Sequence, residues 1–347
     1  MNMKFTVLRI ARAAGLFALF RGLTRRHARI LCYHGGALGD EYLFNGKLFC
    51  RPAMLRQRLD WLKAKGFVPA SLDQVASGTA PASGIPVAIT LDDGWYSSEA
   101  CLLPVLAEYG HAPVLYLHTE ICETGAPVAG VALRYILWKS PLKTVTLQGF
   151  GEGLDGHHAF DEDGARQRLA ARADAWFASL ERDPATVRAA LERFGSAFGV
   201  TPAELDLDSR RFSYMLPDEL RTAAARGCAI ELHGRVHQYY RGEPERNLAN
   251  IAACRQHILD TGLPEPQHYC YPSGAFDEAA GPMLAQAGVR TATTCIPGLV
   301  APGDSSRRYY LPRFLDGGNV DMIEFEAEMS GVLEFMRMVT GRRRIQR

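Results

Sequence analysis

PVAITLDDGW, residues 86–95, is the stretch of sequence that decides the fold. Its first part is a short apolar run with β-branched side chains, which predicts a buried strand, and this run leads directly into Asp92 and Asp93. A helix is expected at about 97–109 and a second strand at 112–118. This βαβ order predicts parallel strands with helices outside them, and functional side chains in such folds lie at the carboxyl ends of the strands.

The same alternation recurs on both sides of this stretch. Residues 123–210 interrupt it, and we interpret them as a mostly helical insertion that is either a lid over a groove or an extension without a role in substrate binding. Strands are expected at 29–34, 228–232, 268–271 and 290–294, and a short strand is expected at 143–148 within the insertion. Helices are expected at 52–65, 162–180, 184–198, 202–206, 217–226, 244–261, 277–287 and 321–340. The run SLDQ (71–74) has the form of a capping box that opens another helix.

Composition excludes some classes of protein. The chain has 347 residues, 47% of them hydrophobic, which suffices for a large core, and its net charge of +1 gives no global field for nucleic acid. Positive charge gathers at both ends of the sequence. Because Arg9 and Arg12 interrupt the first apolar stretch, we expect neither a signal peptide nor a membrane span, and hence a cytoplasmic protein.

Residues 4–20 predict a basic amphipathic helix. Two interpretations stay open, namely peripheral contact with an anionic membrane, on its inner face, or packing on the domain's own core. The residues that share one broad apolar side of this helix are Phe5, Leu8, Ala11, Ala14, Leu16, Phe17 and Phe20.

Asp92 and Asp93 are adjacent carboxylates, which repel each other unless something positive holds them. The turn at Gly94 can bring both into one pocket, so that one can bind a metal ion while the other stays available as a base. The alternative is a solvated Asp-Asp-Gly turn.

His233 and His237 follow the strand expected at 228–232. Together with Asp93 they would offer two imidazoles and one carboxylate to a cation and leave positions open for water and substrate, as in catalytic sites. The alternative is a pair of structural histidines, because the spacing alone is a loose pattern. The sequence therefore predicts a divalent cation, with zinc as the first choice and cobalt, nickel or iron as alternatives, and Asp92 as the base.

These residues resemble the polysaccharide deacetylases of the NodB-homology group, a carbohydrate esterase type, and in particular their exopolysaccharide deacetylase-like branch. TLDDGW (90–95), HGRVH (233–237) and YPSGAFD (271–277) resemble the first three family motifs. The resemblance spans about 29–120 and 211–315, and it implies a distorted (β/α) barrel of about seven parallel strands.

The same resemblance assigns roles to individual residues. It implies Asp92 as general base, Asp93, His233 and His237 as metal ligands, and the backbone N–H of Ser273 as a donor to the developing oxyanion. The residues that it assigns to the substrate groove are Trp95, Tyr271, Pro272, Ser273 and Gly274.

The sequence departs from the family pattern at four places. Gly234 replaces the usual Ser or Thr, Ser273 replaces a Tyr, and Cys270 stands where some members carry an Arg that orients the base. Arg313 could supply that charge instead, the alternative being a surface arginine.

The fourth departure is the late Leu-x-His motif, the usual source of the catalytic acid. TCIPG (294–298) occupies its neighbourhood. His34 is the candidate replacement, because related exopolysaccharide deacetylases use a Tyr-His pair at an early strand end. The alternative is a structural histidine.

The sequence thus predicts three segments, which are an N-terminal amphipathic helix (1–28), a deacetylase barrel (29–320) and a C-terminal helix with a basic tail (321–347). The expected activity is metal-dependent removal of N-acetyl groups from an amino sugar in a surface polysaccharide or glycolipid precursor. The alternatives are hydrolysis of another C–N bond or of an O-acetyl ester, and glycan binding without catalysis.

Overall fold

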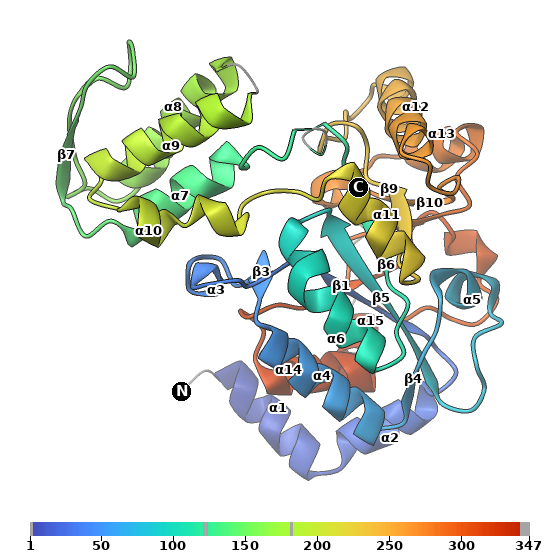
Figure 1. Ribbon diagram of the computed structural model, residues 1–347. Helices are drawn as coiled ribbons and strands as arrows, with labels where there is room; N and C mark the ends of the chain where they lie inside the picture. The colour runs from blue at the N-terminus through green and yellow to red at the C-terminus, as the bar shows by residue number, and fades with distance from the viewer. Residues whose placement is uncertain (1–2, 121, 123, 181–182, 341–347) are drawn as a thin grey trace.

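One parallel sheet forms the centre of the computed structural model, which describes residues 3–120, 122, 124–180 and 183–340 (Figure 1). All pairings within this sheet are parallel, and β4 (Phe67–Pro69) pairs with the first residues of β5. The other strands, in their order across the sheet, are β11 (Thr291–Thr293), β10 (His268–Cys270), β9 (Ala229–Leu232), β6 (Val114–Leu117), β5 (Ile85–Asp93), β1 (Arg29–Tyr33) and β12 (Phe314–Leu315).

The sheet curls because the segment before β12 runs beside β11 at the opposite edge. Ala292 of β11 donates its N–H to the carbonyl of Arg308 at 2.8 Å, and the N–H of Leu311 donates to the carbonyl of Ala292 at 2.9 Å. The chain then enters β12, which pairs with β1. The predicted distorted (β/α) barrel of about seven parallel strands is confirmed, and its seam is the segment 308–315.

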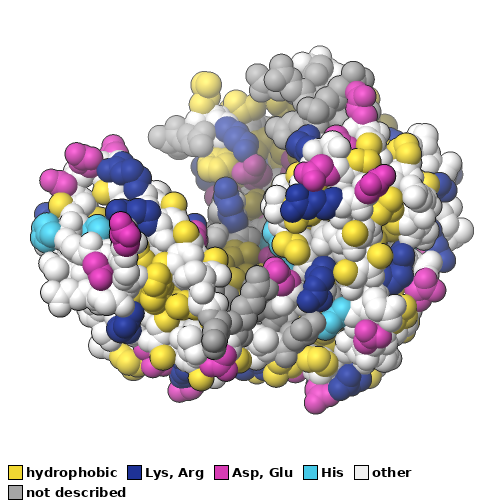
Figure 2. Space-filling view, turned by 90° about the horizontal axis from the view of Figure 1, so that it is seen from above, with side chains coloured by type: hydrophobic (Ala, Val, Ile, Leu, Met, Phe, Trp, Pro, Cys, Tyr) yellow, Lys and Arg dark blue, Asp and Glu magenta, His cyan; other side chains and the backbone are white. Residues whose placement is uncertain are grey.

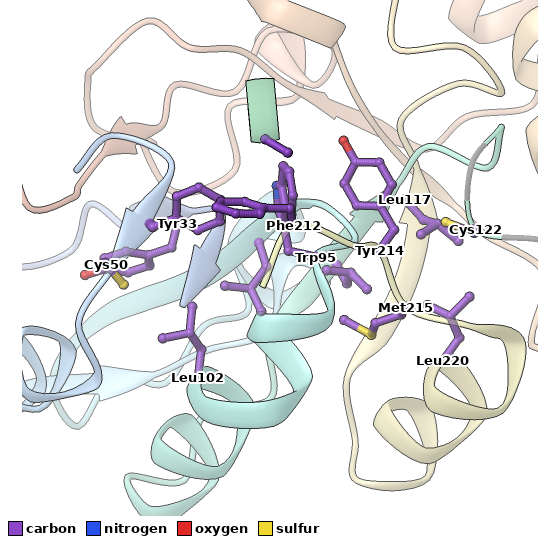
Figure 3. Close-up of a cluster of buried hydrophobic side chains, with 14 of the residues drawn as sticks. Tyr33, Cys50, Trp95, Leu102, Leu117, Cys122, Phe212, Tyr214, Met215 and Leu220 are labelled. Atoms are coloured by element: carbon purple, nitrogen blue, oxygen red, sulfur yellow. The ribbon is translucent and has the colours of Figure 1, made fainter. Parts of the chain in front are cut away.

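Strand β5 is buried along its whole length, which explains why its sequence is an apolar run without alternation. Directly after it, Trp95 enters a cluster of buried side chains, with its ring centroid 4.6 Å from that of Tyr214 and 5.2 Å from that of Phe49. Figure 3 shows this cluster, in which Trp95, Phe212 and Tyr214 lie close together above the helices that follow β5 and precede β9. The turn after β5 is therefore anchored in the core.

Helices cover the outside of the sheet. The predicted helices of the barrel are confirmed, except that the one expected at 97–109 begins as a π-helical turn, η1 (Ser98–Leu102). Both halves of the capping box predicted at residues 71–74 are formed. These helices are α4 (Pro52–Ala64), α5 (Leu72–Ser77), α6 (Leu103–Glu108), α11 (Pro217–Ala225), α12 (Pro244–Asp260) and α13 (Ala280–Gln286).

The insertion forms a lobe beside the barrel (Figure 1). Its helix α7 was not expected from the sequence, and its predicted strand pairs with a second one in an antiparallel hairpin. Asp40 of the barrel fixes this lobe, because it accepts hydrogen bonds from Tyr135 at 2.7 Å and Lys139 at 2.6 Å, both on α7. The elements are α7 (Ala129–Lys139), β7 (Thr144–Leu147), β8 (Gly156–Ala159), α8 (Ala165–Ser179), α9 (Pro184–Ala197) and α10 (Pro202–Leu205).

Each terminal segment forms two helices where one was expected. The N-terminal helices are α1 (Met3–Ala13) and α2 (Leu16–Leu23), and the C-terminal ones are α14 (Met322–Ser330) and α15 (Val332–Val339). The breaks fall at Gly15 and Gly331, whose φ angles of 78° and 86° end a right-handed helix. The predicted basic tail at 341–347 lies outside the described residues.

The apolar side predicted for residues 4–20 largely faces the protein itself. Leu8 and Phe17 are buried in a small cluster with side chains of α14 and α15, and Phe5, Ala11 and Phe20 pack partly against it. Ala14 and Leu16, in contrast, are exposed. Of the two interpretations, core packing therefore describes this side of the helices. Among the described residues, no helix combines the length and the apolar character needed to cross a bilayer.

A buried ion pair fastens the seam of the barrel to α4. The carboxylate of Asp316, just after β12, accepts hydrogen bonds from Arg58 Nε at 3.1 Å and from the hydroxyl of Tyr33 at 2.8 Å. The side chains of Arg58 and Asp316 are 2% and 0% exposed. Removing one partner of such a pair leaves an uncompensated charge in the interior.

We expect Arg58→Leu to lower the free energy of unfolding by about 3–5 kcal/mol, since Asp316 would stay buried without its cation. Urea denaturation followed by circular dichroism measures the loss. Arg56→Leu is the matched control, because Arg56 lies on the same helix and pairs with Glu108 at the exposed surface. Equal stability of the two variants would contradict the role assigned to the buried pair.

Candidate active site

Three side chains from two strand ends converge on one point. Asp93 is the last residue of β5, and His233 and His237 follow β9, which lies one strand away across β6. Asp93 Oδ1 lies 3.5 Å from His233 Nε2 and 3.4 Å from His237 Nε2, and the two imidazole nitrogens are 3.1 Å apart. The sequence-predicted ligand set is thus brought together by the sheet.

These distances fit a small divalent cation. Bonds of about 2.0–2.2 Å in a tetrahedral arrangement place neighbouring ligand atoms about 3.3–3.5 Å apart, close to the spacing of the three atoms here. Asp93 Oδ1 is buried and has no hydrogen-bond partner among the described residues. A bound cation would satisfy this oxygen, and the N,N,O donor set is one that zinc and its divalent neighbours accept.

Neighbouring groups orient the ligands. Trp95 Nε1 donates a hydrogen bond to Asp93 Oδ2 at 3.0 Å, so that the other carboxylate oxygen, Oδ1, faces the two imidazoles. His233 Nδ1 lies 2.9 Å from the carbonyl oxygen of Cys270, so it carries the proton and Nε2 presents a lone pair. Burial opposes the charge of Asp93, but the surrounding histidines outweigh burial and hold the pKa of its carboxyl well below the usual range.

Asp92 points to a different partner. Its carboxylate forms a bidentate pair with Arg313, with Nη1–Oδ1 at 2.7 Å and Nη2–Oδ2 at 2.8 Å. Burial alone would raise the pKa of Asp92, but the guanidinium outweighs this effect and lowers it to about 2. Arg313 is fully buried and also donates to the carbonyl of Thr294 and the hydroxyl of Thr90, so it is not a surface arginine.

The backbone separates the two carboxylates. Asp93 has a φ of 76° and Gly94 a φ of 96°, both in the left-handed region, which aspartate tolerates better than most residues. The bend directs Asp92 toward the seam of the barrel and Asp93 toward the histidines. A Cβ added at Gly94 would come within 2.5 Å of Leu117, so the second left-handed position needs glycine.

His34 and two thiols complete the surroundings of Asp92. One ring nitrogen of His34, Cys32 Sγ and a carboxylate oxygen of Asp92 all lie within 4.8 Å of one another. The thiols of Cys32 and Cys270 point at Asp92 Oδ2 from 3.4 and 3.7 Å. His34 is only half-buried, so among these groups it is the one that substrate could reach.

The residues predicted to line the substrate groove divide into two groups. Ser273 is exposed and Gly274 half-buried, whereas the other three predicted residues are buried. The indole N–H of Trp95 donates to Asp93, and the hydroxyl of Tyr271 donates to the carbonyl of Tyr309 at 2.9 Å. The expectation that the rings of Trp95 and Tyr271 touch substrate is therefore corrected, because both are core side chains that support the site from behind.

Sequence reasoning missed His118, which directly follows β6 between the two ligand-bearing strands. Its ring is buried, stands edge-on to Tyr214 with centroids 4.6 Å apart, and lies 5.5 Å from the ring of His237. Burial lowers the pKa of His118 to about 3, so the ring is neutral and packs beside the ligands. The sequence could have identified His118, because it ends the strand expected at 112–118. Asp92 and Asp93 were selected as polar residues at the carboxyl end of an expected strand.

A hollow separates the insertion from the barrel (Figure 2). A pocket lies where the two join, and it is lined by the loop before α7 and by side chains of α8 such as Asp174 and Phe177. The N–H of Glu120 in this loop donates to the carbonyl of Arg235, which lies between His233 and His237 in the sequence. The junction is thus connected to the segment that carries His233 and His237, and the insertion lies beside it.

The family model described as polysaccharide deacetylase matches residues 185–292, a range that includes both histidines and 271–274 but not Asp92 or Asp93. No match was found among the curated proteins.

Solved deacetylase structures share the fold. IcaB from Ammonifex degensii is 15% identical with a TM-score of 0.53, and the alignment covers 88% of this chain and 97% of that one. The Streptococcus pyogenes deacetylase PplD, in complex with acetate, is 14% identical with a TM-score of 0.55, covering 87% and 98%. A de-N-acetylase from Aggregatibacter actinomycetemcomitans is 14% identical with a TM-score of 0.52, covering 87% and 99%.

We expect the chelator-treated protein to bind about one equivalent of Zn²⁺, and His233→Ala or Asp93→Asn to weaken binding at least about 100-fold, because the first removes one of three donors and the second removes the negative charge of another. Competition with a chromophoric chelator measures the affinity. His157→Ala, an exposed histidine of β8, is the control and should bind like the wild type. If the ligand variants kept wild-type affinity, the three side chains would not form a metal site.

Proposed function

We propose that the chain is a polysaccharide deacetylase of the NodB-homology type, and that it hydrolyses N-acetyl groups on an amino sugar of a surface polysaccharide or glycolipid precursor with a divalent cation as cofactor. The observation that carries the proposal is the pairing of two carboxylates with two separate partners. Asp93 lies with the histidines, and Asp92 lies beside it as an ionised group held by Arg313.

Asp93, His233 and His237 would hold the cation, which supplies Lewis acidity for amide hydrolysis when bound. The side chain of Asp92 then has one task, to accept the proton of the attacking water. Arg313 keeps this carboxylate ionised and fixes both of its oxygens, so its orientation does not depend on substrate.

Two further groups serve the carbonyl and the leaving nitrogen. Ser273, exposed at the end of β10 with a φ of 55°, offers its backbone N–H to the acetyl oxygen as negative charge develops there. His34 donates a proton to the departing amine, because its half-buried ring lies beside Asp92 at the same face of the sheet. The insertion would hold the rest of the glycan.

Incubation with N-acetylglucosamine oligosaccharides should release acetate and leave free amines, in amounts that fall on chelation and return with added metal, because the amide bond is the one cleaved. Enzymatic acetate assay and mass spectrometry measure the products. An O-acetylated glycan is the parallel substrate. Release of acetate from the ester alone would replace the N-deacetylase assignment by an esterase one, and release from neither would argue against both.

The variants Asp92→Asn and Asp93→Asn should distinguish the role of the base from that of the metal ligand, although the two residues are adjacent in the sequence. Asp92→Asn is expected to keep its metal and lose activity by about 10²–10⁴-fold in kcat, since the amide cannot accept the proton. Asp93→Asn is expected to lose metal and activity together. Metal content and acetate release, measured on the same preparations, decide this; a metal-loaded and active Asp92→Asn variant would remove Asp92 from the mechanism.

A further inference from the structure

The outer side of the terminal helices carries a second set of apolar residues, different from those packed on the core. Met3, Val7 and Ile10 recur along α1 at intervals of three and four residues, so they share one side of that helix. Their exposed fractions are 81%, 51% and 64%. Leu19 and Leu23, four apart, expose 55% and 68% along α2.

Helix α15 adjoins α2 and also exposes apolar side chains. The rings of Phe20 on α2 and Phe335 on α15 are in contact, with centroids 4.8 Å apart. Beyond this contact α15 exposes three further apolar side chains, with Val339 at 70%. We name the combined surface the outer helical face, and it consists of Met3, Val7, Ile10, Leu19, Leu23, Phe335, Met336, Met338 and Val339. Single exposed apolar residues are ordinary, but a cluster on adjoining helices indicates a contact surface.

The charges around this face are positive. The four glutamates of α14 and α15 are paired with Lys4, Arg12 and Arg337, so three of their four negative charges are offset. The sequence from residue 3 to residue 39 contains no acid. Arg9, Arg25 and Arg26 are exposed in and just after the two N-terminal helices. The face therefore combines apolar side chains with unneutralised cations.

We propose that the outer helical face docks on an anionic lipid bilayer. Amphipathic helices with aliphatic side chains and flanking arginines bind such interfaces by burying the apolar residues at the headgroup boundary while the cations contact lipid phosphates. A second copy of the chain fits less well, because two such faces would bring like charges together. The residues involved are not those of the predicted apolar side, which the core already occupies.

Docking in this way leaves the active site open. In Figure 1, α1 and α2 lie along the lower edge of the molecule, and the elements that carry the histidine ligands lie toward the top. Figure 2, seen from above, shows the hollow beside the insertion on the side away from these helices. The bilayer would hold the protein while the hollow faces the surrounding solution, so membrane binding and hydrolysis can be tested separately.

Co-sedimentation of the full chain with phosphatidylcholine vesicles, with and without phosphatidylglycerol, tests the proposal. Binding is expected to the vesicles that contain phosphatidylglycerol and to fall at least about tenfold in the Ile10→Ser/Leu23→Ser variant, since two exposed apolar anchors are lost. Arg9→Gln/Arg25→Gln should weaken it as well. Leu43→Ser, an exposed leucine of α3 (Glu41–Phe44) outside this face, is the matched control and should bind like the wild type.

Three results would overturn the proposal. These are absence of binding to anionic vesicles, binding that the serine variant leaves unchanged, and a dimer in light scattering that the serine variant dissociates, which would assign the face to a second copy. Circular dichroism checks that the variants are folded. The readout does not involve acetate release, so failure here and failure of the proposed activity are distinguishable.

Discussion

The buried pair between Asp92 and Arg313 is the interaction on which the rest of the site depends. Two adjacent carboxylates at the end of a buried strand cannot both stay ionised unless each has a positive or hydrogen-bonding partner. Arg313 gives Asp92 such a partner in a bidentate geometry, and Asp93 has the histidines and the indole of Trp95. Arg313 also belongs to the seam, where the last part of the barrel joins the first strand. The same arginine thus belongs to the seam of the barrel and keeps Asp92 ionised.

Much of this arrangement follows from the sequence by one geometric rule. Parallel strands end at a common edge, so Asp93 after β5 and the histidines after β9 had to lie near each other, although 140 residues separate them along the chain. The strands formed by short apolar runs and the capping box at residues 71–74 were likewise predictable, because they depend on local sequence. The sequence suggested Arg313 as a cation near Asp92. Its bidentate contact could not be predicted, because the position of Arg313 depends on the seam at the two-residue strand β12.

The parts that the sequence did not predict have physical causes. Trp95 and Tyr271 were assigned to the groove from the resemblance alone, and only packing shows that both rings face inward. Helix α7 lies between an irregular loop and a hairpin, and its sequence lacks a side-chain cap at the N-terminus. The terminal helices were each expected as one because their apolar periodicity continues through Gly15 and Gly331. Helix α1 has two apolar sides, and the spacing of its apolar residues does not show which side packs on the core.

The pairing of Asp92 with Arg313 has a consequence for how the chain matures. The two residues are 221 positions apart, so during synthesis on the ribosome the strand that carries both aspartates is complete long before its counterion exists. A nascent or truncated chain that stops before residue 308 leaves Asp92 without its counterion and lacks the segment that closes the barrel, although the partners of Asp93 are already present. The surroundings of Asp92 are thereby completed only after the segment that closes the barrel has been made.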